Sequence, residues 1–192
     1  MKKFLTMVVA LILIFCVCSS CTSKKEEAEY KAKVKQELDS IPLEETGYKL
    51  VETNYSDNER VQKYKNELTI DGHIYKFSSD YNNNFITDEA YFYITVDDKK
   101  EDYKKIYLSK YGDAFNYYTH FYGCYYFDGQ IFLVKDKRVG TMFGRQLEYY
   151  LPPILFLYDY EKNTIKYCGY FEEWFNYRVF DAAEKYFKIV KT

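Results

Sequence analysis

The chain has 192 residues, with 27 lysines and arginines, 29 aspartates and glutamates, and a formal net charge of −2 at pH 7. This balance excludes the basic surface that a nucleic-acid-binding protein normally presents to phosphates. The 24 tyrosines and 15 phenylalanines favour β-strands, because aromatic side chains pack well across a pleated face. They either form an exposed platform for sugars or peptides or simply fill the faces of a sheet.

The first 20 residues have the three-part layout of a secretory signal. Lys2 and Lys3 give a cationic start, residues 4–18 are almost all apolar, and two serines stand directly before Cys21. The apolar run is shorter than the stretch of about 20 residues that crosses a bilayer core as a helix. A permanent transmembrane helix is therefore the weaker interpretation.

The sequence Ser19-Ser20-Cys21 resembles the lipobox of bacterial lipoproteins, in which the signal is cleaved before the cysteine and the thiol is acylated. The resemblance covers only this part of the chain, and Cys18 stands where the usual pattern has an aliphatic residue. It implies removal of residues 1–20, a lipid anchor on Cys21 and a place in the bacterial cell envelope. The alternatives are an ordinary cleaved signal that releases the protein and an uncleaved anchor.

The residues after Cys21 indicate which membrane the anchor would occupy. In enteric bacteria, an aspartate directly after the acylated cysteine resembles an inner-membrane retention signal. This chain has Thr22 at that position, which favours the outer membrane. Residues 23–27 resemble the lysine-plus-acidic export tags of some surface lipoproteins of the Bacteroidetes. A charged, solvated tether is the equal alternative, so both the periplasmic face and the cell surface stay open.

The predicted organisation has three parts. Residues 1–20 are the signal peptide, residues 21–42 form a lipidated, charged tether and helix, and residues 43–192 form one domain. From Cys21 onward the chain has 172 residues and a net charge of about −4, because the signal contains two lysines and no acidic residue. This length is sufficient for one domain with a substantial core.

A helix is predicted over residues 24–39, which are rich in charge and free of glycine and proline. Its apolar stripe is narrow, with a spacing of four residues, and consists of Tyr30, Val34 and Leu38. Such a helix would serve as a spacer from membrane to domain. It should end near Ile41, because Pro42 disfavours helical geometry in the residue before it.

Strand signals dominate the first half of the domain. Asp71-Gly72 predicts a two-residue hairpin turn, because both positions tolerate positive φ. That turn pairs Glu67 with Lys76 and Leu68 with Tyr75. The elements expected here are a strand at 48–55, a hairpin at 67–77 and a strand at 89–96.

A second helix is predicted over residues 98–112. Asp98 and Glu101 have the spacing of a capping box, and Gly112 suits the C-terminal cap. The side chains expected on its apolar face are Tyr103, Ile106 and Tyr107.

Two further hairpins and a short helix complete the expected fold. Asp128-Gly129 predicts a turn between strands 117–127 and 130–135, and a glycine-punctuated loop follows at 138–146. This hairpin pairs Tyr126 with Ile131 and Tyr125 with Phe132. Another hairpin is expected between strands 154–160 and 164–170, and it pairs Asp159 with Lys166 and Tyr158 with Tyr167.

A capping-box spacing at residues 181–184 predicts a closing helix over 182–190, with an extended strand over 186–190 as the alternative. Three consecutive hairpins predict an α+β domain, in which one or two helices pack on an antiparallel sheet.

Two cysteines remain in the domain once the signal is removed and Cys21 is acylated. Cys124 and Cys168 form an even pair in an exported domain, a pattern that indicates a disulfide. Their expected cross-strand partners are Leu133 and Leu157. Two buried free thiols are the alternative.

No catalytic, metal or cofactor site is predicted. The two histidines are His73 and His120, and the latter lies about 13 Å from Cys124 if the strand is regular, too far for proton transfer. The acidic pairs Asp97-Asp98 and Glu172-Glu173 are interpreted as a helix start and a solvated turn.

A core position is the preferred interpretation of Trp174, with the edge of a binding surface as the alternative. A solvated loop is the preferred interpretation of the basic cluster Lys135, Lys137, Arg138 and Arg145.

The sequence therefore predicts a membrane-anchored envelope lipoprotein whose domain binds a protein or glycan partner without catalysis. One alternative is a periplasmic protein of the immunity or inhibitor type. Another is an enzyme whose site assembles from dispersed residues.

Overall fold

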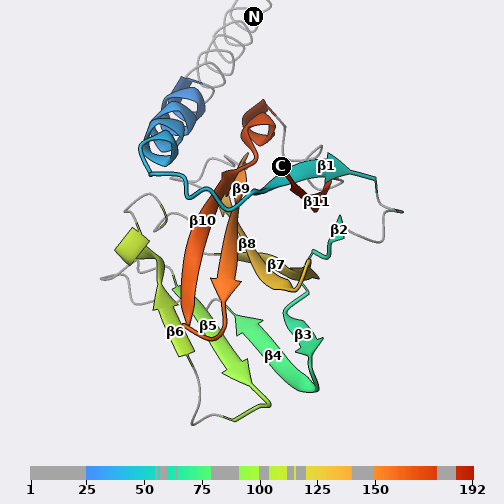
Figure 1. Ribbon diagram of the computed structural model, residues 1–192. Coiled ribbons are helices and arrows are strands. Elements are labelled where there is room, and N and C mark those ends of the chain that lie inside the picture. Colours follow the sequence, from blue (N-terminus) through green and yellow to red (C-terminus); the bar gives the residue numbers. More distant parts are fainter. Residues whose placement is uncertain are drawn as a thin grey trace, which may run out of the picture.

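The computed structural model describes residues 25–54, 56, 60–63, 65–78, 91–99, 104–111, 115, 120–139, 149–176 and 185–192. These residues form an N-terminal helix, three antiparallel sheets and short 3₁₀ turns (Figure 1). The predicted α+β class, with sheets built from hairpins, is confirmed.

The middle layer is a four-stranded sheet, called the central sheet, in the order β10-β9-β8-β7. Its strands are β7 (His120–Phe127), β8 (Gln130–Val139), β9 (Tyr149–Asp159) and β10 (Thr164–Tyr170). A second sheet, β3-β4-β5-β6, consists of β3 (Glu67–Ile70), β4 (His73–Ser78), β5 (Tyr91–Val96) and β6 (Lys104–Tyr107). The third sheet, β1-β11-β2, consists of β1 (Tyr48–Thr53), β11 (Tyr186–Lys191) and β2 (Arg60–Val61). The 3₁₀ turns are η2 (Leu108–Tyr111) and η4 (Glu172–Asn176).

The central sheet is buried on both faces. Along β8, Ile131 and Leu133 lie in a core cluster with β3–β6, whereas Phe132 and Val134 lie in a second cluster with β1, β2, β11 and η4. None of the four side chains is exposed to solvent. A strand covered on both faces needs apolar residues without alternation, which explains the run of consecutive apolar residues in β8.

The N-terminal helix occupies residues 25–39, as predicted from its charge pattern. Backbone amides of Ser40 and Ile41 still bond to carbonyls of the last turn, and Pro42 follows. Val34 and Leu38 are fully buried in the cluster between the central sheet and β3–β6. The helix is therefore packed on the domain and contributes to its core.

The two hairpins with Asp-Gly turns have the predicted registers. Asp71 and Gly72 have φ of 51° and 82°, and Asp128 and Gly129 have φ of 52° and 74°. The observed pairs include Glu67–Lys76, Leu68–Tyr75, Tyr125–Phe132 and Tyr126–Ile131. β1 also forms, over Tyr48–Thr53 of the predicted 48–55, and β5 forms over Tyr91–Val96, while residues 55, 89 and 90 lie outside the described part.

The predicted helix over 98–112 is wrong where the structure describes it. Asp97 and Asp98 have φ of 53° and 55° and form a turn, closed by a 3.1 Å bond from the Lys99 amide to the Val96 carbonyl. β6 then pairs with β5, and η2 follows. Pairing with a buried neighbouring strand outweighs the local helix signal. Glu101, Tyr103 and Gly112 lie outside the described residues.

The register of the third hairpin differs from the prediction by two residues. Asp159 lies opposite Thr164 and Tyr158 lies opposite Ile165. The reason is a longer connection, in which the Asp159 carboxylate accepts a 2.9 Å bond from the Lys162 amide. Asn163 has a φ of 51°. The side chain thus holds a four-residue turn that sequence spacing does not reveal.

β8 and β9 are longer than predicted. They continue to pair as far as Val139 opposite Tyr149, so residues 138 and 139 belong to a strand and not to a loop. β9 passes through Pro152 and Pro153 where the β8–β9 register shifts, a position at which a strand tolerates proline.

The closing helix predicted over 182–190 is also wrong for residues 186–190. These residues belong to β11, which pairs with β1 on one side and β2 on the other. The extended alternative is therefore confirmed, and residues 182–184 lie outside the described part.

Gly123 marks a close approach of two backbones. A Cβ at this position would lie 2.3 Å from the Gln62 carbonyl oxygen, and the Cys124 amide donates to the Lys65 carbonyl at 3.0 Å. The register shift between Phe121 and Gly123 accommodates this crossing of β7 by the chain that follows β2. No larger residue fits without movement of backbone.

We expect Gly123→Ala to lower the free energy of unfolding by about 2 kcal/mol or more, because backbone must shift to relieve the overlap. Denaturant unfolding followed by circular dichroism measures the change, with the exposed Thr69→Ala as control. A Gly123→Ala protein within about 0.5 kcal/mol of wild type would contradict the close approach.

Candidate functional site

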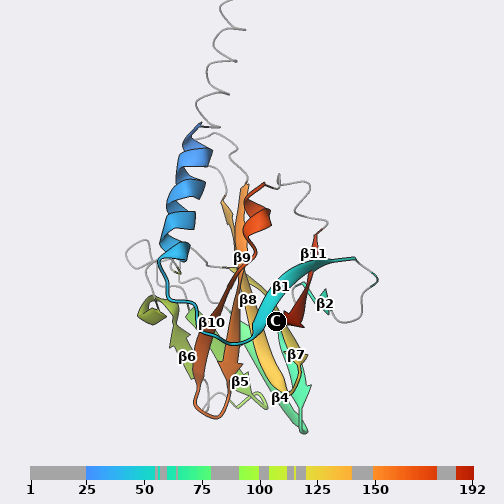
Figure 2. The same cartoon turned by 45° about the horizontal axis from the view of Figure 1, so that its top comes forward.

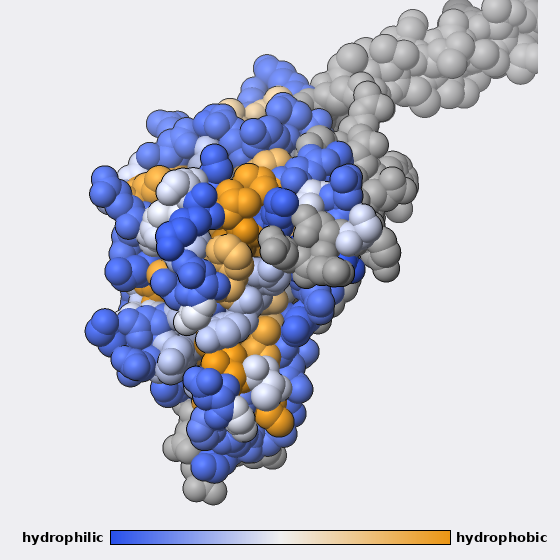
Figure 3. Space-filling model, turned by 45° about the vertical axis from the view of Figure 1, so that its right-hand side comes forward, coloured by the Kyte–Doolittle hydropathy of each residue, from blue (hydrophilic) through white to orange (hydrophobic). Residues whose placement is uncertain are grey.

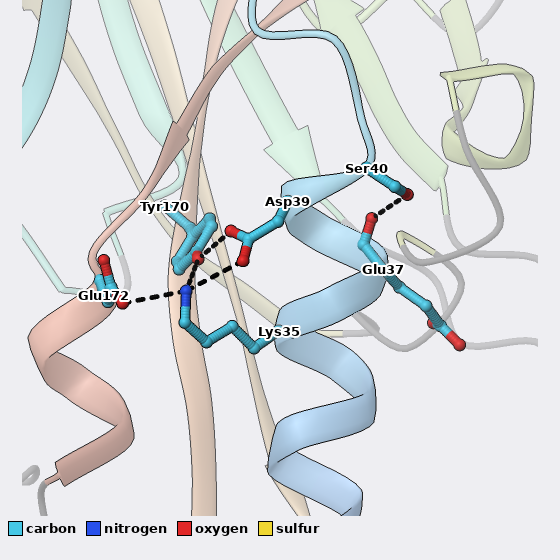
Figure 4. Close-up of polar contacts among 6 residues, drawn as sticks. All are labelled: Lys35, Glu37, Asp39, Ser40, Tyr170 and Glu172. Carbon is cyan, nitrogen blue, oxygen red and sulfur yellow. Dashed lines mark hydrogen bonds and ion pairs between the residues drawn. The ribbon is translucent and has the colours of Figure 1, made fainter.

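A cluster of four polar side chains joins the N-terminal helix to the domain; Figure 4 shows it. This helix-docking cluster consists of Lys35 and Asp39 on the helix, Tyr170 at the end of β10 and Glu172 in η4. The Lys35 ammonium contacts Asp39 at 2.9 Å, Tyr170 at 3.1 Å and Glu172 at 2.9 Å. The Tyr170 hydroxyl donates to the second Asp39 oxygen at 2.5 Å. Lys35 thus contacts each of the other three residues, and Tyr170 also bonds to Asp39, so the four side chains form one connected network.

The cluster flanks the apolar stripe of the same helix. Val34 and Leu38 are buried beneath it, and Tyr30 and Ile41 pack partly on the same core. One turn earlier, the Lys31 ammonium donates to the Phe175 carbonyl at 3.1 Å. Since residues three and four apart share a helix face, the spacing from 31 to 38 places all these contacts on one side.

The electrostatics of the cluster favour fixed charges at neutral pH. Hydrogen bonds that the Lys35 ammonium donates to Glu172, Asp39 and Tyr170 raise the pKa of Lys35 above its usual range. Hydrogen bonds from Tyr170 and Lys35 lower the pKa of Asp39. Burial, followed by the bond to Asp39, raises the pKa of Tyr170 to about 12. None of these shifts brings a group toward neutral pH, so the arrangement suits holding the helix in place better than proton transfer.

The C-terminal end of the helix has its own cap. The Ser40 hydroxyl donates to the Glu37 carbonyl at 2.6 Å, as Figure 4 also shows. The same carbonyl also accepts from the Ser40 amide at 3.2 Å, so Ser40 closes the last turn with two bonds.

We expect Leu38→Ala to lower the free energy of unfolding by about 2–4 kcal/mol, because the change removes a buried side chain from the shared core. Glu29→Ala, on the exposed side of the same helix, should change it by less than about 0.5 kcal/mol. Denaturant unfolding of both variants makes the comparison. Equal effects would show that the helix is not part of the folded core.

A buried lysine and aspartate stand side by side in β8. Lys135 has no exposed surface, and its ammonium donates to the Tyr91 carbonyl at 3.0 Å and lies 4.9 Å from the Phe92 ring centre. Asp136, the next residue, is buried as well. The solvated loop predicted for this basic cluster is therefore wrong at Lys135, because the strand continues through it.

Burial shifts both groups of this pair toward neutral pH. It lowers the pKa of Lys135 to about 7, which the Asp136 charge opposes. It raises the pKa of Asp136 to about 6, which Lys63 and Lys135 oppose. A neutral amine is a competent nucleophile, but this one is enclosed by a carbonyl and a ring, without exposed surface. We therefore assign Lys135 to the packing of the sheet.

The Lys135 pKa makes stability depend on pH. Well below pH 7 the amine is protonated in the folded and the unfolded chain, so the cost of burying its charge is present in full. Between the folded value of about 7 and the ordinary value of 10.5, only the unfolded chain binds the proton, so this cost disappears as pH rises. Wild type should therefore gain stability relative to Lys135→Met from about pH 7 to 10, by at most about 1.4 kcal/mol per pH unit.

Unfolding free energies of both proteins across this pH range test the prediction, with the exposed Lys110→Met as control. A constant difference between wild type and Lys135→Met would contradict a buried titrating amine.

The histidine and acidic side chains beside the β3–β4 and β5–β6 turns form local contacts. His73 Nδ1 lies 2.9 Å from Asp97, whose other oxygen accepts from the Ile74 amide at 2.9 Å. Those two bonds lower the pKa of Asp97. Asp98 pairs with Lys76 at 2.7 Å. Among the described residues, no group of three or more histidines, cysteines and acids is placed to hold a metal ion.

The tryptophan beside the second acidic pair is part of the core. Trp174 is 1% exposed and packs on Phe187 with ring centres 5.0 Å apart. Its neighbour Glu172 is engaged in the helix-docking cluster, which the sequence did not suggest. Of the two interpretations of Trp174, the structure confirms the core position.

The two domain cysteines are free and buried. Cys124 and Cys168 lie on the first and fourth strands of the central sheet, about 14 Å apart at ordinary strand spacing. A disulfide requires Cα atoms within about 7 Å. The predicted bond is therefore not formed, and the alternative of two free thiols is what the structure shows. Cys168 lies at a register shift beside Tyr167 and Gly169, not opposite Leu157 as predicted.

Neither thiol is set up as a nucleophile. Burial raises the pKa of Cys124 to about 12 and that of Cys168 to about 11. A thiolate is the reactive form, and both values disfavour it at neutral pH. The backbone of His120 lies opposite Asp136, whereas Cys124 lies opposite Leu133. Cys21 and the signal lie outside the described residues.

We expect neither Cys124 nor Cys168 to react with iodoacetamide in the folded protein, because both thiols are buried and protonated. In denaturant without reductant, both should be alkylated, as intact-mass measurement would show. Alkylation that requires a reductant would instead reveal a disulfide.

The described tyrosines mostly fill the faces of the sheets. Tyr126 and Leu43 are the exposed large apolar side chains in the described part of the chain. On the outer face of β5 and β6, the Lys105 ammonium lies 3.8 Å from the Tyr91 ring centre and 4.7 Å from that of Tyr107. In Figure 3, apolar areas on one face of the molecule are separated by hydrophilic side chains. These contacts favour the filling role over a continuous aromatic platform.

Comparison with known proteins adds no family. No family model, curated protein or solved structure matches the chain. Across the described residues, the helices are too short or too polar to cross a membrane.

Proposed function

We propose that the protein is a lipid-anchored protein of the bacterial cell envelope, located in the outer membrane, whose domain binds a protein or glycan partner without catalysis. The observation that supports it is the position of the docked helix. The described part of the helix begins at residue 25, four residues after the lipobox-like cysteine, and it packs on the domain core. An acyl anchor on Cys21 would thus be joined directly to a folded domain.

The contacts of the titratable groups support a binding role over a catalytic one. Lys35 and Asp39 hold the helix, His73 and Asp97 join two turns, and Lys135 is enclosed in the central sheet. Each of these groups has a structural partner. The net charge of the chain, −2, favours a partner other than nucleic acid.

We expect Cys21→Ser to abolish labelling with a radioactive or alkyne-bearing fatty acid and to accumulate the unprocessed precursor. The reason is that the thiol is both the acylation site and part of the cleavage site. Cys18→Ser is the matched control, since it removes a neighbouring thiol from the same segment and should leave labelling intact. Unchanged lipid labelling and membrane partition in Cys21→Ser would refute the anchor.

The binding role is tested in the same strains. Chemical cross-linking in intact cells, followed by purification of the protein, should yield a defined partner that Cys21→Ser loses if the partner is membrane-bound. Cross-links that form equally with every abundant envelope protein would argue against a specific binding domain.

A further inference from the structure

The distance between the proposed anchor and the helix is short. Four peptide links join Cys21 to Lys25, and a fully extended chain of that length spans at most about 14 Å. The helix from residue 25 to 39 is itself about 22 Å long. If Cys21 is acylated, the first turn of the helix must therefore lie close to the bilayer surface.

The helix meets the domain at three successive levels. Lys31 bonds to the Phe175 carbonyl at 3.1 Å, Lys35 pairs with Glu172 at 2.9 Å, and Asp39 accepts from the Tyr170 hydroxyl at 2.5 Å. One contact would leave the helix free to pivot. Three contacts spread over two turns, with Val34 and Leu38 buried between them, define its direction as well as its position.

The opposite end of the domain consists of hairpin turns. β10 begins at Thr164, directly after its turn, and ends at Tyr170 in the helix-docking cluster, so the turn lies about 20 Å from this cluster. Tyr75 and Tyr160 pack with ring centres 5.9 Å apart, which joins the β9–β10 turn to the β3–β4 hairpin. The 2.9 Å contact between His73 and Asp97 joins the β5–β6 turn to the same β3–β4 hairpin. Figures 1 and 2 both place these turns at the end away from the N-terminal helix.

From these observations we propose that the docked helix fixes the orientation of the domain on the bilayer. The end that carries η4 and the start of the helix faces the lipid. The end that carries the β3–β4, β5–β6 and β9–β10 turns faces away from it. This inference rests on the proposed acylation of Cys21.

The inference can be tested without acylation in cells. The mature chain, residues 21–192, is coupled through Cys21 to a maleimide phospholipid in phosphatidylcholine vesicles. Cys124 and Cys168 are buried and should not compete for the maleimide. A donor dye is attached through an azide-bearing residue at Asn176 or at Glu161, and an acceptor dye is placed on lipid headgroups.

Energy transfer from position 176 should exceed that from position 161 by about twofold or more, because the two positions differ in height by roughly the 20 Å length of β10. A second protein with ten glycine and serine residues inserted after Thr22 leaves the domain intact but lengthens the tether. It should bring the two positions toward equal transfer, since such a linker adds about 17 Å of flexible reach.

Equal transfer from both positions with the native tether, or stronger transfer from position 161, would overturn the proposed orientation. This failure is separate from failure of the anchor, which only the Cys21→Ser labelling in cells addresses.

Lys35→Glu gives an independent check on the helix. It places a third negative charge beside Asp39 and Glu172, and it should reduce the difference between the two dye positions while circular dichroism shows that the sheets remain folded. A folded Lys35→Glu protein with an unchanged difference would show that the helix-docking cluster does not set the orientation.

Discussion

The rest of this structure depends on a central sheet that is covered by other strands on both faces. The central sheet must present apolar side chains upward and downward from every strand, which β8 does with Ile131 to Val134. Two separate cores follow from this requirement, one against β3–β6 and one against β1, β2, β11 and η4. The high content of tyrosine and phenylalanine supplies the side chains for both, and their rings meet largely edge to face.

The same constraint explains the polar groups that lie inside. A long strand through the middle layer carries whatever follows its apolar run into the interior, so Lys135 and Asp136 are buried and shifted toward neutral pH. It also separates Cys124 from Cys168 by the width of the sheet. Neither feature needs a catalytic explanation, since sheet geometry alone accounts for both.

The chain between the helix and β1 extends the docked arrangement along the edge of the central sheet. Glu44 pairs with Lys166 at 3.8 Å, and a Cβ on Gly169 would lie 3.4 Å from Leu43. The amide of Thr192 donates to the Gly47 carbonyl at 2.7 Å, which brings the C-terminus to the start of β1. The chain from the N-terminal helix to β1 is thus in contact with the domain along its length.

The sequence allowed prediction of features that depend on local chemistry. The Asp-Gly turns fixed two hairpin registers because both positions need positive φ, and the stripe containing Val34 and Leu38 identified the first helix and its buried face. The helices predicted from capping-box spacings did not form at Asp98 or over residues 186–190, because β6 pairs with β5 and β11 pairs with β1 and β2. The helix-docking cluster could not be predicted, since Tyr170 and Glu172 stand more than 130 residues from Lys35 and no local pattern joins them.

The contacts described above hold the helix next to Cys21 firmly on the domain. Hydrogen exchange measures this most directly, because an isolated helix of this length is marginal in water and its amides would exchange quickly. If the helix is docked in this way, amides of residues 31–39 are protected to an extent comparable with those of β10. Rapid exchange over 31–39 with full protection in β10 would contradict it.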